Sequence, residues 1–159
     1  MTSLSAIHSV VQAVAGAAGW KTPQQVSTGV FVFHLEGGLV LELFSPDNWT
    51  GVLKGDLGPV PQAPDTELRL SRLASLSVRA MKKRGSVLSL SSGTLPARLE
   101  LTRTFDLPGL AHPSARHKLL GLARDFLNDL AWWRRQTRGN AGEPAPANLL
   151  APPPGWVRL

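Results

Sequence analysis

The 159-residue sequence contains no cysteine, no tyrosine and few aromatic residues, which make up 6% of the chain. Without cysteine the protein has no disulfide bonds, no thiolate metal ligands and no thiol nucleophile, a composition typical of a cytoplasmic protein. The lack of tyrosine disfavours a base-stacking surface for RNA or DNA. No stretch approaches the roughly 20 consecutive apolar residues that span a membrane. We therefore expect a soluble, cytoplasmic protein that does not insert into a membrane.

Catalytic and cofactor-binding motifs are also missing from the sequence. There is no G-x-S-x-G nucleophile elbow, no phosphate-binding loop and no dinucleotide-binding glycine pattern. His112 and His117 are five positions apart, a spacing that does not place two metal ligands on one helix face. Asp125 and Asp129 stand one helical turn apart and are interpreted as part of a solvated face. The sequence thus predicts a protein that is not an enzyme, has no metal site or cofactor, and acts through its surfaces.

The most informative stretch is residues 28–44, TGVFVFHLEGGLVLELF, which predicts a β-hairpin. Two runs rich in aliphatic and aromatic residues flank Gly37-Gly38, a pair that can adopt the positive φ values of a tight turn. The arms are largely apolar on both faces, so both faces need cover from a helix, a second sheet or another chain. Because a lone hairpin is only marginally stable, the rest of the chain has to supply such cover.

The other elements follow from apolar periodicity and from turn residues. They are a helix at 3–18, a third strand at 49–57, a helix at 67–83, strands at 86–91 and 97–105, and a last helix at 114–136. Gly19 and Pro23 lead from the first helix into the hairpin, 58–64 is a proline-rich connection, and 107–113 is a loop. The order α-β-β-β-α-β-β-α, with strands in two antiparallel groups, predicts a single α+β domain built as an antiparallel sheet with flanking helices.

The two ends of the chain differ from the middle. The first 20 residues superficially resemble a secretion signal, but no basic residue precedes their apolar run, and we interpret them as an amphipathic helix, with cleavage as the alternative. From Gly139 the composition turns rich in proline and glycine, which does not form a packed core. The sequence therefore predicts a folded domain at 1–138 and a flexible tail at 139–159. The tip of the tail, 156–159, docks either on a partner or on its own domain.

The chain is basic, with a net charge of +6 and an isoelectric point near 10.8. Such a balance suggests nucleic acid, an anionic membrane or an acidic partner. The basic segments 82–84 and 134–138 both lie at the ends of predicted helices, where the helix dipole favours cations in any protein. The charge is therefore compatible with these partners without pointing to one of them.

The element order, with these patterns inside it, resembles the CesT-like effector chaperones of type III secretion. The matching features run from about residue 4 to 136: a first helix ending near Gly19-Trp20, the hairpin VFVFHLEGGLVLELF, a strand near Val52-Leu53, a helix with LSRLASL, the strands SVLSLS and ARLELTRTF, and a helix with FLNDLAWW. The resemblance implies a homodimeric, ATP-independent chaperone. Such a protein holds the chaperone-binding segment of a secreted effector in a non-globular, secretion-competent state.

The resemblance also implies which residues carry these roles. In the family, the second helix and the following strand pair build the dimer, which here points to Leu73, Leu76, Met81, Val87 and Leu90. The effector wraps over apolar patches of the first helix and first three strands, here Val11, Val30, Val32, Leu41, Leu43 and Leu53. Each patch residue is equally a candidate for the core, and the sequence leaves both alternatives open.

One feature departs from the family, because many of these chaperones are acidic and this chain is basic. An acidic client, a contact with the export apparatus such as its ATPase, or a reused fold would each explain the difference. Two other functions stay open: a basic nucleic-acid-binding module, and a structural or adaptor subunit of the secretion machinery that does not handle effectors.

Overall fold

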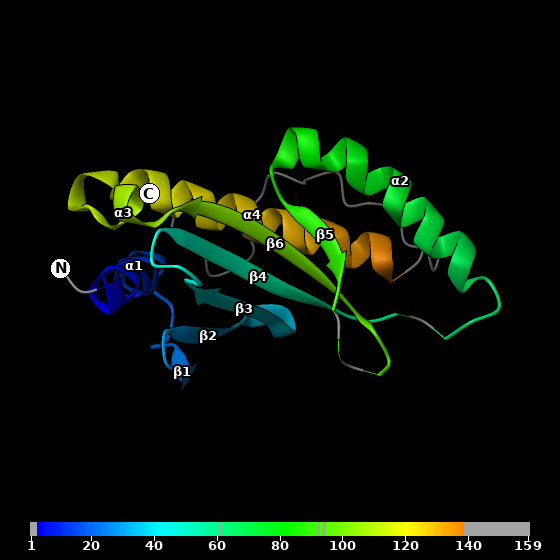
Figure 1. The fold of residues 1–159 in the computed structure, drawn as a ribbon, viewed down its shortest axis with the longest axis horizontal. Helices are drawn as coiled ribbons and strands as arrows, with labels where there is room; N and C mark the ends of the chain where they lie inside the picture. Colours follow the sequence, from blue (N-terminus) through cyan, green and yellow to red (C-terminus); the bar gives the residue numbers. More distant parts are fainter. Residues whose placement is uncertain (1–2, 61, 92, 94, 139–159) are drawn as a thin grey trace.

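The computed structural model describes residues 3–60, 62–91, 93 and 95–138 (Figure 1). Its helices are α1 (Ser3–Ala18), α2 (Thr66–Arg84), α3 (Leu107–Ala111) and α4 (Arg116–Thr137), with the short 3-10 helices η1 (Glu36–Gly38) and η2 (Pro113–Ala115). Its strands are β1 (Gln24–Ser27), β2 (Val30–Leu35), β3 (Leu39–Phe44), β4 (Thr50–Pro59), β5 (Val87–Leu90) and β6 (Arg98–Asp106). The predicted tail at 139–159 lies outside the described residues.

All six strands join one antiparallel sheet in the order β1-β2-β3-β4-β6-β5. The first four strands follow one another, and α2 then carries the chain to β5 on the far edge, from which it returns as β6 beside β4 (Figure 1). The strands expected in two groups therefore form one continuous sheet, with β1 and β5 at its edges. The predicted α+β domain, an antiparallel sheet with flanking helices, is confirmed.

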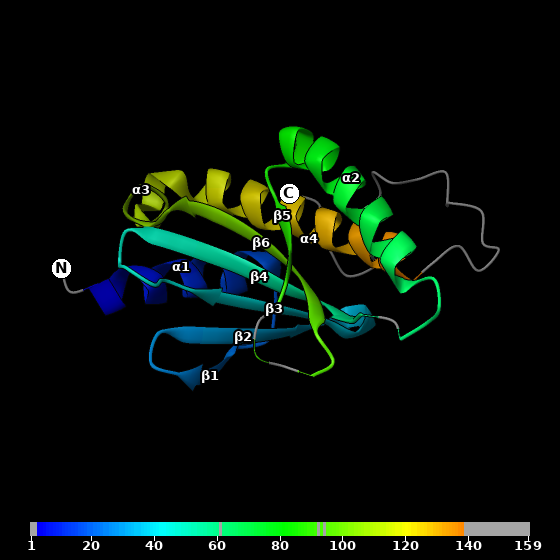
Figure 2. The same ribbon diagram turned by 45° about the vertical axis from the view of Figure 1, so that its right-hand side comes forward.

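Helices α1 and α4 contact each other and cover one face of the sheet, while α2 packs on α4 and β5 (Figure 2). The register places Phe31 and Phe33 of β2 on the same face as Leu41 and Leu43 of β3. The ring of Trp20, just after α1, meets the Phe33 ring edge-on at 5.3 Å between centroids. The core therefore lies between the sheet and these two helices. Among the described residues, no helix covers the opposite face (Figure 2).

Two glycines in β4 let neighbouring side chains approach the sheet closely. A Cβ atom on Gly55 would overlap the side chain of Leu130 on α4, and one on Gly51 would overlap the ring of Phe105 on β6. Leu130 is completely buried and Phe105 is 9% exposed. Glycine inside a strand normally weakens it. The structure shows that these two glycines also have a packing role, since only glycine leaves room for these side chains.

Replacing Gly55 with alanine should lower the free energy of unfolding by about 1–3 kcal/mol, because the added methyl group forces Leu130 or α4 to shift. Gly121→Ala is the matched control. A Cβ at Gly121 on α4 would meet open space, and alanine is favoured over glycine inside a helix by about 0.8–1 kcal/mol. Urea unfolding followed by circular dichroism should move the two midpoints in opposite directions. An unchanged midpoint for Gly55→Ala would show that this contact tolerates a methyl group.

The structure differs from the sequence-based expectation at three places. Residues 24–27 form the edge strand β1, which the sequence QQVS does not signal because it lacks apolar alternation. Residues 107–111 form the short helix α3, anchored by the buried Leu107, where a loop was expected. β4 continues to Pro59, two residues past the predicted end. At the hairpin turn, Gly37 and Gly38 have φ angles of 73° and 70°, as the pair predicts.

Candidate functional site

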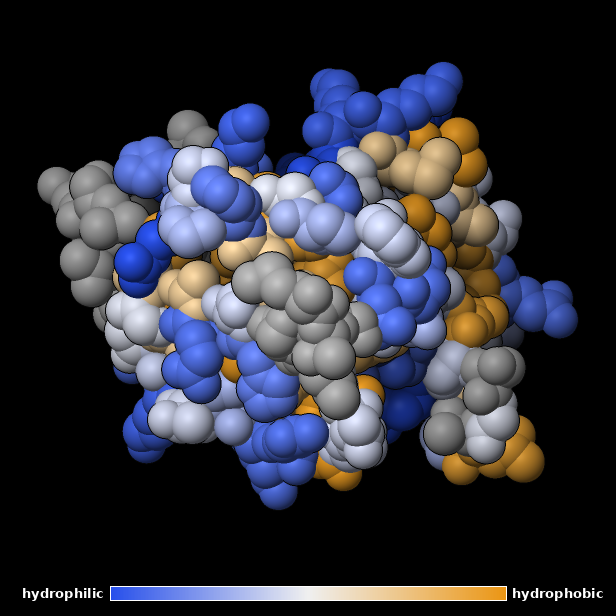
Figure 3. All heavy atoms as spheres, turned by 60° about the vertical axis from the view of Figure 1, so that its left-hand side comes forward, coloured by the Kyte–Doolittle hydropathy of each residue, from blue (hydrophilic) through white to orange (hydrophobic). Residues whose placement is uncertain are grey.

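Exposed apolar side chains lie on α2 and on both faces of β5, at one edge of the sheet. Met81, Val87 and Leu90, all predicted dimer residues, are 47%, 45% and 51% exposed, and Val78 is 60% exposed. Figure 3 shows hydrophobic residues over this side, at the upper right, below a cap of hydrophilic ones. We call these four residues and the half-buried Leu76 the α2–β5 surface. Large exposed apolar patches on soluble proteins mark interaction sites.

The same region adds an open sheet edge to this apolar surface. β5 is four residues long and lies last in the strand order, so its outer edge has no strand partner among the described residues. Such an edge presents free N–H and C=O groups to another chain.

The prediction that Leu73 lies at the dimer interface is wrong. Leu73 is 9% exposed and packs in the core, because it lies on the inner face of α2.

Buried polar contacts fix the joint between α2 and β5. Arg84 Nη1 donates to Asp129 Oδ1 at 2.9 Å, and Ser86 Oγ donates to Asp129 Oδ2 at 2.8 Å. The Arg84 guanidinium also lies 4.7 Å from the centre of the Trp132 ring, a cation–π contact. Asp129 is only 4% exposed, so its assignment to a solvated face was wrong. Arg84 at the end of α2 and Ser86 just before β5 thus supply the partners of the carboxylate.

Several predicted client-binding residues belong to the core. Leu41, Leu43 and Leu53 lie on the sheet face beneath the helices, and Val11 lies on the inner face of α1; each is at most 2% exposed. They cannot form an exposed patch on the single chain, so the core alternative holds for these four. The physical reason is that α1 and α4 both pack on this face of the sheet.

Val30 and Val32 point to the opposite, helix-free face. The register places Val30 opposite Phe44 on β3 and Phe44 opposite Val52 on β4, so an apolar row crosses three strands. Val30 and Phe44 are half-buried, and Val32 and Val52 are each 9% exposed. We call Val30, Val32, Phe44 and Val52 the open-face patch. The sequence reasoning did not select Phe44 and Val52, although the alternation of β3 already placed Phe44 on this face.

A charged cluster lies beside the open-face patch. Lys54 Nζ is 3.0 Å from Glu100 Oε1 and 3.7 Å from Glu42 Oε2. Burial by itself would lower the pKa of Lys54, but the hydrogen bond to Glu100 and the charge of Glu42 together raise the pKa above its usual value. The apolar part of this sheet face therefore ends at a paired polar cluster.

The edge strand β1 extends the open-face patch toward solvent. Gln24 pairs with Val32 and Ser27 with Val30, which places β1 directly beside the patch. Val26 on this strand is 55% exposed. As the first strand in the sheet order, β1 has no partner on its outer side among the described residues. An extended peptide could add to this edge by main-chain hydrogen bonds.

Within the described ranges, the chain offers no cluster of three or more residues that could hold a metal ion. His112 Nδ1 lies 2.8 Å from Ser114 Oγ, and His8 packs edge-on against Phe31 at 4.8 Å between ring centroids. None of the described helices is long and apolar enough to cross a membrane.

No protein-family model matches the sequence, and no curated protein matches it either. Solved structures, however, share its fold. One chain in the structure of the HopA1–SchA chaperone–effector complex superposes with a TM-score of 0.64 at 13% identity, covering 85% of this chain and 98% of that chain. The Yersinia pestis type III secretion chaperone SycH, in complex with a stable fragment of YscM2, gives 0.52 at 11% identity, covering 79% and 98%. The ExsC–ExsE complex gives 0.56 at 15% identity, covering 80% and 90%.

This chain has the type III secretion chaperone fold. The resemblance seen in the sequence is thereby confirmed at the level of the fold. In this secretion-chaperone fold, the α2–β5 surface and the open-face patch with β1 lie at opposite edges of one six-stranded sheet. Two different protein chains could therefore occupy them at the same time.

Proposed function

We propose that this protein is a type III secretion chaperone, a cytoplasmic homodimer that binds the chaperone-binding segment of a secreted effector and keeps it secretion-competent without ATP. The observation that carries the proposal is the similarity of the fold, over 85% of this chain, to a structure of a chaperone–effector complex. The open edges and exposed apolar residues of the sheet support it. The proposed function is binding, not catalysis.

The client would bind as an extended segment along β1 and across the open-face patch. The outer edge of β1 supplies N–H and C=O groups that pair with an extended chain. Val26 and the half-buried Val30 offer apolar contacts beside this edge. Only a locally unfolded client presents both a free backbone and alternating side chains. Binding of this kind holds the client segment in a non-globular state by itself, so it needs no energy from ATP.

The second copy of the chain would occupy the α2–β5 surface. Met81, Val87 and Leu90 would then be buried between the copies, and the outer edge of β5 would be covered. A two-fold dimer presents the client site twice, which lets one long segment bind both copies with a gain in avidity. The dimer thus makes a weak extended-chain contact strong enough to hold an effector.

Co-purification from the native host tests the proposal. The tagged full-length protein is isolated with its bound partners, which are identified by mass spectrometry, and hydrogen exchange maps the protected segment of each partner. We expect to recover a secreted effector that is protected from hydrogen exchange in one segment only. A component of the export apparatus, such as the ATPase of that apparatus, should be recovered with it if the chaperone also contacts the apparatus. Recovery of secretion-machinery components alone would favour an adaptor subunit. Recovery of nucleic acid, with an affinity that falls steeply with salt, would favour a nucleic-acid-binding module.

Val26→Asp should weaken binding of the identified client segment at least about tenfold, since it places an unpaired charge where an apolar contact forms. Isothermal titration with the purified segment measures the change. Leu95→Asp is the control, because Leu95 is also an exposed apolar residue but lies between β5 and β6. Equal affinities for the Val26→Asp and Leu95→Asp variants would remove β1 from the client site.

A further inference from the structure

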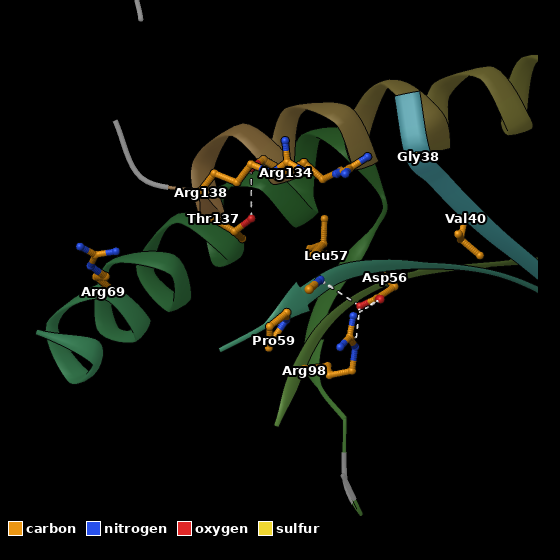
Figure 4. Close-up of a pocket in the computed structure, with 11 residues that line it drawn as sticks. Gly38, Val40, Asp56, Leu57, Pro59, Arg69, Arg98, Arg134, Thr137 and Arg138 are labelled. Carbon is orange, nitrogen blue, oxygen red and sulfur yellow. Dashed lines mark hydrogen bonds and ion pairs between the residues drawn. The ribbon is translucent and has the colours of Figure 1, made fainter. Parts of the chain in front are cut away.

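A groove rich in arginine lies at the end of α4. One cavity of about 560 Å³ lies between α4, the end of β4 and the start of α2. Figure 4 shows Arg134 and Arg138 on one side of it and Asp56, Leu57 and Pro59 on the other. We call this cavity the arginine groove; its lining includes Val40, Leu57, Pro59, Arg98, Arg134 and Arg138.

The groove continues into a second cavity. This neighbour, of about 430 Å³, shares Arg134 and Arg138 with the first and is also lined by Arg135, Leu39 and Ala131. Glu36 is the acidic residue of its lining. The two cavities meet at the shared pair of arginines, so the site is elongated. This shape suits a segment of chain more than one small anion.

Some of the arginines around the groove are already neutralised by the protein. Arg98 pairs with both oxygens of Asp56, with Nε 3.1 Å from Oδ1, and Arg69 Nε donates to Asp65 Oδ2 at 2.7 Å. Burial acts to raise the pKa of Asp56, but hydrogen bonds from Arg98 and from the Gly58 N–H outweigh it and leave the pKa lowered. Asp56 therefore stays ionised and committed to Arg98.

Arg134 and Arg138 have no such partner. Neither forms an ion pair within the described part of the chain, and the side chain of Arg134 donates one hydrogen bond, to the Gly37 carbonyl at 3.2 Å. Burial and the nearby charge of Arg138 both lower the pKa of Arg134, and together they outweigh the opposite effect of the Asp56 charge. Arg134 is half-buried and Arg138 is exposed, and two neighbouring cations, one of them partly removed from water, favour a bound anion.

The walls of the groove indicate which anion fits. Arginine forms paired hydrogen bonds with carboxylates, while Val40, Leu57 and Pro59 offer apolar contacts between the charges. Neither cavity is lined by an aromatic residue that could stack on a nucleic-acid base, which single-strand binding normally uses. We propose that the arginine groove binds an acidic segment of a partner protein, with Arg134 and Arg138 pairing with its carboxylates. The proposal stands whether or not the chain is a secretion chaperone.

The test uses the full-length protein and a short fluorescent peptide in which glutamate alternates with leucine. Fluorescence anisotropy should show binding that weakens with added salt. The Arg134→Gln/Arg138→Gln variant should bind at least about tenfold more weakly, a loss of about 1.4 kcal/mol. Arg138 is exposed, and Arg138→Gln alone leaves the contact between Arg134 and Gly37 intact. This variant should lose part of the affinity that the double variant loses. Arg124→Gln, an exposed arginine elsewhere on α4, should bind like the wild type.

Three results would overturn the proposal. One is that Arg124→Gln weakens peptide binding as much as the Arg134→Gln/Arg138→Gln variant does, which would mean that only the net charge of the protein matters. Another is equal binding of a matched peptide with glutamine in place of glutamate. The third is tighter binding of a single-stranded oligonucleotide with the same dependence on Arg134 and Arg138, which would make the groove a nucleic-acid site. None of these outcomes affects the client-binding test, since the Val26→Asp variant does not alter the groove.

Discussion

Replacing Val87 and Leu90 together with aspartate should dissociate the proposed dimer into monomers. Both side chains are about half exposed in the single chain, and the proposed dimer buries them. An unpaired carboxylate in an apolar interface costs several kcal/mol, so the two changes should raise the dimer dissociation constant at least about a hundredfold. Light scattering after size exclusion, over a series of protein concentrations, measures the change.

The fold itself should survive in the Val87→Asp/Leu90→Asp variant, because neither side chain belongs to the core. Circular dichroism should therefore match the wild type. Val26→Asp makes the same chemical change on the opposite edge strand and should leave the protein dimeric. A wild-type protein that is monomeric at every concentration, or a double variant that stays dimeric, would contradict the assignment of the α2–β5 surface to the second copy.

Local sequence pattern was enough to predict the order of the main elements and the two faces of the hairpin. Alternation in β2 and β3 separates Phe31 and Phe33 from Val30 and Val32, because side chains in a strand alternate strictly between faces. The same pattern does not say which face the helices cover. That depends on where α1 and α4 pack, and for this reason Leu41 and Leu43 were candidates for a surface they do not reach.

The features that the sequence could not predict depend on residues far apart in the chain. Asp129 stands one turn from the exposed Asp125, and only contacts to Arg84 and Ser86, 45 and 43 positions away, show that it is buried. The contact of Arg134 with Gly37 joins residues 97 positions apart. Basic residues at a helix end have an ordinary local explanation, so the groove that they line becomes visible only in the folded chain.

The largest loss of stability is expected for Asp129→Ala. Breaking a buried ion pair by removing one partner typically costs about 3–5 kcal/mol. Here the Arg84 side chain is 36% exposed and can turn to water, so we expect about 2–4 kcal/mol, with the unpaired Ser86 hydroxyl contributing part of it. Asp125→Ala, on the same helix but exposed, should change the free energy of unfolding by less than about 0.5 kcal/mol. Urea unfolding measures both.

Asp129→Ala should also weaken the proposed dimer. Arg84 and Ser86, which both bond to Asp129, lie in the chain between the surface residues Met81 and Val87. Without the carboxylate, α2 and β5 lose the contact that sets their relative position. The α2–β5 surface then has to become ordered when the two copies associate, and this ordering lowers the affinity of the dimer. Asp129→Asn keeps an acceptor for the Ser86 hydroxyl but loses the charge opposite Arg84, so its stability and dimer affinity should fall between those of Asp129→Ala and the wild type. If Asp129→Ala unfolds at the same urea concentration as Asp125→Ala, the buried pair does not stabilise this joint, and the link from Asp129 to the dimer fails with it.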